Sequence, residues 1–144
     1  MDSPSERFWL ALEKLVGESE VVIDRPKGVH HPQSLEITYP VDYGYLKDTK
    51  SMDNQGIDVW RGSDPDAKID AIICTVDLRK KDSEIKILIG CTPEEKKLIL
   101  AFHNRWDMSG ILVQRLTSNS HSPQKNSTSA RLLTCQRKLA SRGR

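Results

Sequence analysis

Two helix-start signals of the same form enclose the central part of the chain. Ser3-Pro4-Ser5-Glu6 and Thr92-Pro93-Glu94-Glu95 each place a hydroxyl residue at the cap position, a proline at the first helical position and a glutamate three residues after the cap. Apolar residues then recur at helical spacing after the first signal, as far as Gly17, which ends the pattern. The sequence therefore predicts two helices, with the region between them in another conformation.

Short runs of strand-forming residues, separated by turn residues, occupy that region. The runs are Val21–Ile23, Glu36–Tyr39, Ile57–Trp60, Ile69–Val76 and Ile85–Ile89, and Ile111–Val113 follows the second helix. The two runs richest in Ile and Val are typical of buried strands, and Arg79-Lys80-Lys81 between them is expected at the solvated tip of a hairpin. This order of elements favours the α+β class, with a small, mostly antiparallel sheet or barrel.

The charge of the chain changes character after residue 115. The whole sequence of 144 residues has 22 basic and 20 acidic side chains, but residues 116–144 contain six basic side chains and no acidic ones. Residues 1–115 therefore carry a net charge of −4. The segment after them is rich in serine and lacks aromatic residues, so it buries too little apolar surface to offset its ordering entropy. We expect one domain over 1–115 and a basic, disordered tail over 116–144.

Several protein classes are excluded by what the sequence lacks. No apolar run approaches the roughly 18 residues of a transmembrane helix, and no secretion signal is recognisable. The cysteines Cys74, Cys91 and Cys135 are odd in number and form no C-x-x-C pair, which argues against a disulfide framework or a zinc site. A cytoplasmic protein is therefore expected.

Acidic residues stand within or beside the strand-like runs between residues 42 and 84. Asp53 and Asp58 flank a turn, and Asp77 ends the most apolar run. A carboxylate in such a run is costly to bury unless it is paired or binds a metal, and Mg²⁺ prefers hard oxygen ligands. A solvated strand end is the simpler explanation for any single acid. Several acids beside tyrosines and lysines together favour a binding site.

Four segments in this region share their patterns with one known family. They are Val22–Gly28 (VIDRPKG), Tyr39–Tyr45 (YPVDYGY), Ser51–Val59 (SMDNQGIDV), and Thr75–Asp77 followed by Glu84–Lys86. In order, they resemble the early strand with an E-x-P-K-G-type turn, the Y-P-x-[ND]-Y-G-[YF] segment, the D-G-D-P-x-D-V signature, and the later carboxylate and lysine pair of the soluble family I inorganic pyrophosphatases. The resemblance covers roughly residues 18–105. It implies a pyrophosphatase-like domain over residues 1–115, built as an OB-like five-stranded barrel with flanking helices.

The resemblance also implies an activity, the Mg²⁺-dependent hydrolysis of inorganic diphosphate to phosphate, and a role for eight residues. Asp53 and Asp58 would be catalytic and would bind Mg²⁺. The other implied metal ligands are Asp77, Asp82 and Glu84, of which either Asp82 or Glu84 would complete the activating site. The residues implied to contact the phosphates of the substrate are Lys27, Tyr43 and Lys86. Each of the two lysines taken alone is more simply a surface residue.

Some positions depart from the family pattern and favour an alternative function. Gln55 and Gly56 replace the second aspartate and the proline of the signature, and a neutral amide cannot take a proton from water. The segment Val29–Thr38 is short and lacks the family's hairpin with a phosphate-binding arginine, a role for which the spacing of Arg25 is wrong. The alternative is a catalytically degenerate domain that binds a phosphorylated ligand or a protein partner. No membrane partner is expected, and no nucleic-acid partner, because the tail lacks aromatic residues for stacking and the body is acidic. A homo-oligomer remains open.

Overall fold

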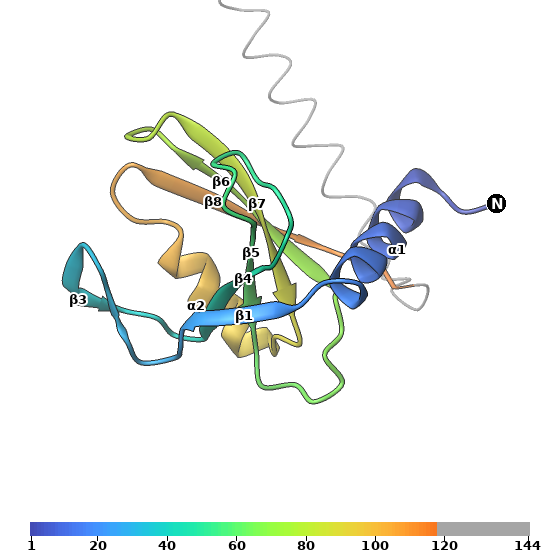
Figure 1. Cartoon of the computed structure of the whole chain (residues 1–144), viewed down its shortest axis with the longest axis horizontal. Coiled ribbons are helices and arrows are strands. Elements are labelled where there is room, and N and C mark those ends of the chain that lie inside the picture. The colour runs from blue at the N-terminus through green and yellow to red at the C-terminus, as the bar shows by residue number, and fades with distance from the viewer. Residues whose placement is uncertain (118–144) are drawn as a thin grey trace, which may run out of the picture.

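The structure, a computed structural model, describes residues 1–117 of the chain (Figure 1). In chain order the elements are α1 (Pro4–Gly17), β1 (Val21–Arg25), β2 (His30–His31), β3 (Ser34–Thr38), β4 (Asp42–Leu46), β5 (Ile57–Arg61), β6 (Ala71–Asp77), β7 (Asp82–Ile89), α2 (Pro93–Phe102) and β8 (Met108–Gln114). All but the first two residues of the predicted tail lie outside the described residues. No helix within residues 1–117 is long and apolar enough to cross a membrane.

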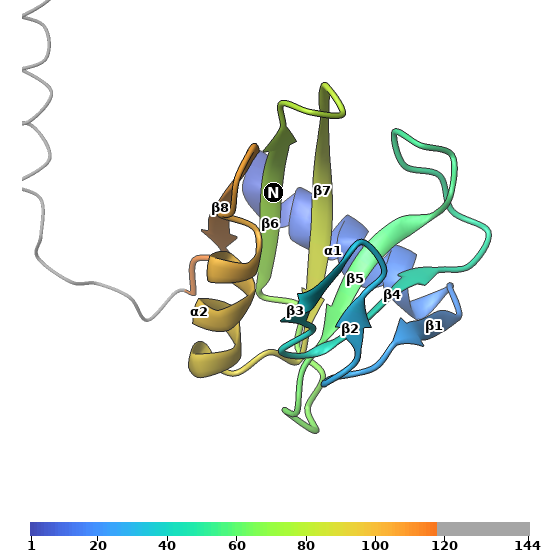
Figure 2. The same cartoon turned by 90° about the vertical axis from the view of Figure 1, so that its left-hand side faces the viewer.

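The principal strands form one mixed sheet of six strands in the order β1-β4-β5-β7-β6-β8, and β2 and β3 form a separate hairpin (Figure 2). Strands β5 and β7 pair in parallel, and the other neighbours in the sheet pair antiparallel. The α+β class and the mostly antiparallel sheet are therefore confirmed. The sheet has six strands where five were expected, and β1 and β8 end it without pairing with each other in the described part of the chain.

Both helices begin where the capping signals predict. Ser3 and Thr92 each accept a hydrogen bond from the backbone N–H of the glutamate three residues later, and that glutamate's side chain accepts one from the cap residue's N–H. Helix α1 lies behind the sheet in Figure 2 and packs Leu12, Leu15 and Val16 against a buried cluster that includes Val59, Ile87 and Ile89. Helix α1 therefore covers one face of the sheet.

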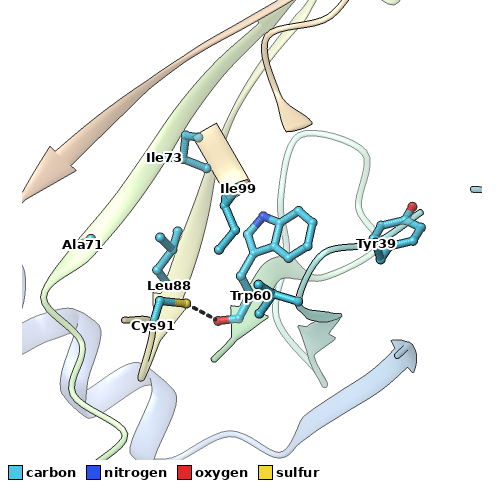
Figure 3. Packing of buried hydrophobic residues seen from close by; sticks show 8 residues of the cluster. Tyr39, Trp60, Ala71, Ile73, Leu88, Cys91 and Ile99 are labelled. Atoms are coloured by element: carbon cyan, nitrogen blue, oxygen red, sulfur yellow. Dashed lines mark hydrogen bonds between the residues drawn. The ribbon is translucent and has the colours of Figure 1, made fainter. Parts of the chain in front are cut away.

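Helix α2 covers part of the opposite face. Its fully buried Ile99 packs with Trp60, Ile73 and Leu88, and the Sγ atom of Cys91 donates a weak hydrogen bond to the Trp60 carbonyl (Figure 3). Because successive side chains of a strand point to opposite faces, Lys86 lies on the same face as Leu88, two residues further along β7. Polar side chains are thereby brought to the α2 face, next to the aromatic core.

Gly44 in β4 lies where two strands approach closely. A Cβ atom at this position would stand 1.8 Å from the Val22 carbonyl oxygen of β1, a distance that no side chain tolerates. The glycine of the DYGYL strand is thus required for β4 to pair with β1. This pairing holds the neighbouring Tyr43 beside the polar residues of β5 and β7.

Candidate functional site: an acidic cleft

A cleft of about 560 Å³ opens on the α2 face of the sheet, beyond the C-terminal end of α2. Its walls come from β1, β4, β5, β6 and β7, with further residues from β2, from the loop after β4 and from the end of α2. The acidic residues that line it are Asp24, Asp53, Asp58, Asp77, Asp82 and Glu84, and the cationic ones are Arg25, Lys80 and Lys86. Six carboxylates against three cations give the cleft a negative potential, which attracts cations.

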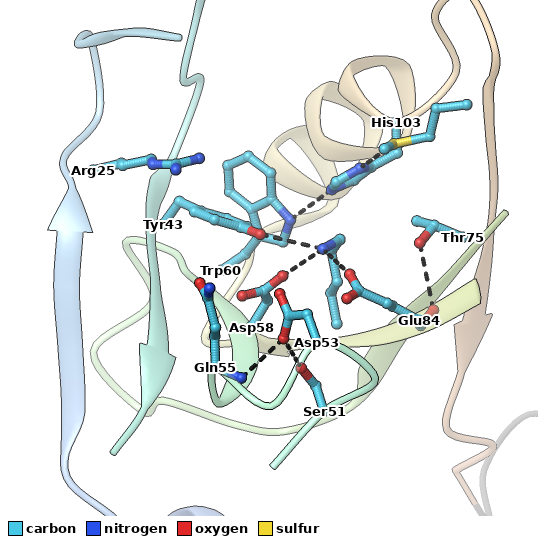
Figure 4. A network of polar contacts seen from close by, with 12 residues as sticks. Arg25, Tyr43, Ser51, Asp53, Gln55, Asp58, Trp60, Thr75, Glu84 and His103 are labelled. Carbon is cyan, nitrogen blue, oxygen red and sulfur yellow. Dashed lines mark hydrogen bonds and ion pairs between the residues drawn. The ribbon is translucent and has the colours of Figure 1, made fainter. Parts of the chain in front are cut away.

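Lys86 is at the centre of a hydrogen-bond network on the floor of the cleft (Figure 4). Its ammonium group donates to Asp58 Oδ2 at 2.5 Å, to Glu84 Oε2 at 3.0 Å and to the Tyr43 hydroxyl at 3.2 Å. These three bonds use all the donors of an ammonium group. Lys86 is only 5% exposed, so this is a buried cation held between two carboxylates.

The protonation states of this network follow from its burial and charges. Burial alone would lower the pKa of Lys86, but its interactions with Tyr43, Asp58 and Glu84 outweigh burial and raise that pKa. Burial raises the pKa of the Tyr43 phenol, although the charge of Lys86 opposes the shift. At neutral pH Lys86 is therefore charged and Tyr43 protonated, and the Tyr43 hydroxyl is hydrogen-bonded to Asp58 as well.

Asp53 lies in the turn before β5, at the rim of the cleft. Its Oδ1 atom accepts hydrogen bonds from the Ser51 hydroxyl at 2.6 Å and from the backbone N–H of Gln55 at 3.0 Å. These two bonds lower the pKa of the exposed Asp53 carboxyl. The Gln55 side chain also lines the cleft, so a neutral amide stands where the family pattern has a carboxylate.

Asp77 has a structural partner in the hairpin between β6 and β7. Its Oδ1 atom accepts from the backbone N–H groups of Arg79 at 2.9 Å and Lys80 at 3.1 Å. The burial of this carboxylate is thus compensated by the hairpin, and the predicted hairpin tip is confirmed. Asp82 lies opposite Asp77 in the strand register, which places two carboxylates side by side at this end of the cleft.

A buried histidine also lines the cleft. Trp60 Nε1–H donates to His103 Nε2 at 3.0 Å, and His103 Nδ1 lies 3.3 Å from Met108 Sδ. Because Nε2 is the acceptor, the ring proton resides on Nδ1. Burial lowers the pKa of His103 to about 3, with a smaller contribution from the charge of Lys86. The ring is therefore neutral at physiological pH and serves to fix Trp60.

The structure brings together seven of the eight residues that the sequence predicted for the site, since Tyr43, Lys86 and all five predicted metal ligands line the cleft. Lys27 is the exception: its side chain is exposed and does not line the cleft, and its backbone N–H donates to Asp42 Oδ1 at 2.9 Å. Arg25, two residues before it, does line the cleft, as do Tyr39 and His31. The sequence prediction missed these three because their participation depends on a strand register that has no local signal.

The donor chemistry of the cleft fits a divalent cation, because carboxylate oxygens are the ligands that Mg²⁺ prefers. The arrangement is different, because within residues 1–117 no three His, Cys, Asp or Glu side chains are grouped closely enough to hold a metal ion. The Lys86 ammonium instead supplies the positive charge between Asp58 and Glu84. A metal ion that used both of these acids would have to compete with the lysine.

No protein-family model matches the chain, and a search of curated proteins finds no match. The resemblance to family I inorganic pyrophosphatases therefore stays a prediction that rests on the quoted motifs.

Proposed function

We propose that this protein is a Mg²⁺-dependent hydrolase of inorganic diphosphate, with its active site in the acidic cleft. One observation carries the proposal. Seven residues that sequence patterns alone assigned to this chemistry, from Tyr43 to Lys86, line a single cleft although they come from β4, β5, β6, β7 and the segment between β4 and β5. The proposal includes an OB-like arrangement of the sheet, open between β1 and β8.

The carboxylates of the cleft would hold the metal ion, which would have to draw them together and displace Lys86 from Asp58 and Glu84. Asp53 and Asp58 come from the turn before β5 and from β5 itself, and Asp77, Asp82 and Glu84 come from the β6–β7 hairpin. When bound, Mg²⁺ would lower the pKa of a water molecule and neutralise charge on the leaving phosphate. Tyr43 keeps its proton at neutral pH, and its hydroxyl could donate that proton's hydrogen bond to a phosphate oxygen in place of Asp58. Lys86 adds a fixed positive charge next to the Tyr43 hydroxyl.

The test is an assay of phosphate release from diphosphate by the purified full-length protein, with Mg²⁺, Mn²⁺ or Zn²⁺ and without metal. We expect metal-dependent release that Asp58→Asn abolishes. Asp66→Asn is the matched control, because Asp66 is exposed and lies outside the cleft lining. Circular dichroism of each variant separates loss of activity from loss of fold. Release no higher than the metal-free background with all three metals would reject the proposal.

A second function is favoured by Gln55 and by the engagement of Lys86 with two of the expected metal ligands. In this alternative the cleft binds a phosphorylated ligand, or serves a protein partner, without hydrolysis. Calorimetry distinguishes the two functions, because diphosphate binding without phosphate release supports the alternative. Turnover that depends on Asp58 excludes it.

A further inference from the structure

We infer that Arg25, His31 and Lys80 form an anion subsite at one end of the cleft, which takes a phosphoryl group of a diphosphate. The class of ligand rests on the proposed function. The position of the subsite rests on the geometry of the cleft. All three side chains line the cleft, and none of them was assigned a role by the sequence patterns.

The other lysines of the predicted site are poorly placed to bind an anion. All three N–H donors of the Lys86 ammonium are already bonded to Asp58, Glu84 and Tyr43. Lys27 lies outside the cleft lining. By contrast, neither Arg25 nor Lys80 forms a salt bridge within residues 1–117. Arg25 and Lys80 thus carry the positive charges of the cleft that are not directly paired with a carboxylate.

Arg25 is held in position by aromatic side chains. Its Nη1 atom donates to the Tyr39 hydroxyl at 2.5 Å, and its guanidinium lies 5.6 Å from the centre of the Tyr39 ring and 5.8 Å from that of Tyr43. The guanidinium has five N–H donors, and this is the one side-chain hydrogen bond that Arg25 makes in the described part of the chain. The remaining donors form a planar fork that suits phosphate oxygens.

His31 adds a neutral donor beside this guanidinium. Its ring stacks on Tyr39 at 5.9 Å with an interplanar angle of 12°. Nδ1 accepts from the backbone N–H of Gln33 at 3.0 Å, so the proton of the neutral ring is on Nε2. Burial, and then the charges of Arg25 and Lys80, lower the pKa of His31, so the ring is neutral at physiological pH.

Asp24 also lines the cleft near this subsite. It makes no salt bridge with the guanidinium in residues 1–117, so the arginine donors are not occupied by it. The cleft therefore carries carboxylates around Lys86 and the donors of Arg25 and His31 around Tyr39, and Lys80 adds its charge from the β6–β7 hairpin.

The test measures binding of methylenediphosphonate, a diphosphate analogue that resists hydrolysis, by calorimetry with the full-length protein in Mg²⁺. Arg25→Met and Lys27→Met are a matched pair, since the two cations are two residues apart in the chain but only Arg25 lines the cleft. We expect Arg25→Met to weaken binding about tenfold or more, the effect of a lost charge-assisted hydrogen bond, and Lys27→Met to change it less than about twofold.

Lys80→Met provides a second variant, because Lys80 is exposed at the hairpin tip and its loss cannot unfold the core. We expect it to weaken binding about threefold, as for a partly screened charge. Binding by Arg25→Met and Lys80→Met as tight as by the wild type overturns the subsite, even if the wild type hydrolyses diphosphate. Arg25-dependent binding without phosphate release upholds the subsite while the proposed hydrolysis fails. Absence of any binding by the wild type overturns the subsite.

Discussion

Replacing Lys86 by methionine removes the cation from the centre of the cleft while keeping most of the side-chain volume. The Asp58 and Glu84 carboxylates then face each other without a counter-ion, and the Tyr43 hydroxyl loses its donor. Breaking a buried ion pair in this way costs about 3–5 kcal/mol. Because the side chains of Asp58 and Glu84 remain 27% and 13% exposed, water can solvate part of the exposed charge. We therefore expect a loss near the lower limit, about 3 kcal/mol.

Urea denaturation at neutral pH measures this loss. With a slope of about 2 kcal/mol per molar urea, a loss of about 3 kcal/mol lowers the midpoint by roughly 1.5 M. Lys97→Met is the matched control, since Lys97 is exposed on α2 and pairs with Glu94 at 3.7 Å, and an exposed pair contributes about 0–1 kcal/mol. A Lys86→Met midpoint no lower than that of Lys97→Met would show that the lysine does not hold the cleft together.

The pH dependence of the same difference is a second check. The pKa of Lys86 is raised in the folded state, so its stabilisation is fully present below the unfolded pKa of about 10.4 and is lost as the pH rises through the folded pKa. The difference in unfolding free energy between wild type and Lys86→Met should stay constant from neutral pH to about pH 10 and shrink above it. A difference that decreases between pH 7 and 9 contradicts the reasoning.

Three further predictions concern other residues of the fold and the cleft. Because burial lowers the pKa of His103 to about 3, stability should fall below about pH 6.5 by up to about 1.4 kcal/mol per pH unit, and His103→Gln should reduce this slope in chemical denaturation. Gly44→Ala should destabilise by at least about 3 kcal/mol, since its Cβ would meet the backbone of β1, whereas Gly17→Ala has open space and should be neutral or stabilising in thermal melts. Asp77→Ala should cost about 1–2 kcal/mol and Asp77→Asn much less, because only the amide can still accept the two hairpin N–H groups; equal melting temperatures for the two variants would contradict this.

The helices and most strands could be predicted because their signals are local. Capping residues within four positions of one another mark the starts of α1 and α2, and apolar runs mark six of the strands, β8 among them. Strand β4 is not among the predicted strands, because the segment Tyr39–Tyr45 has no apolar run, although Tyr43 and Tyr45 carry strand propensity. The parallel pairing of β5 with β7 has no local signal. It depends on how the whole sheet packs.

The same limit explains what was missed in the site. Acidic residues near strand ends indicated where the cleft would be, but the contact between Asp58 and Lys86 depends on the β5–β7 pairing. Arg25 and Lys27 differ because Arg25 is the last residue of β1 and Lys27 lies in the turn that follows. A sequence pattern with a fixed period of two would place both side chains on one face, so it cannot predict which of them lines the cleft.

Lys86 links the two candidate functions, because its ammonium and a divalent ion require the same carboxylates. A metal ion bound by both Asp58 and Glu84 would release Lys86 from two of its three partners and leave its charge available to a phosphate group. If the lysine stays in place, it neutralises much of the charge that would hold the ion, and the cleft can bind an anion only around Arg25. Hydrolysis and binding without hydrolysis thus differ in which cation holds these two acids. Any divalent ion that is bound through Asp58 and Glu84 should therefore bind more tightly to the Lys86→Met variant than to the wild type.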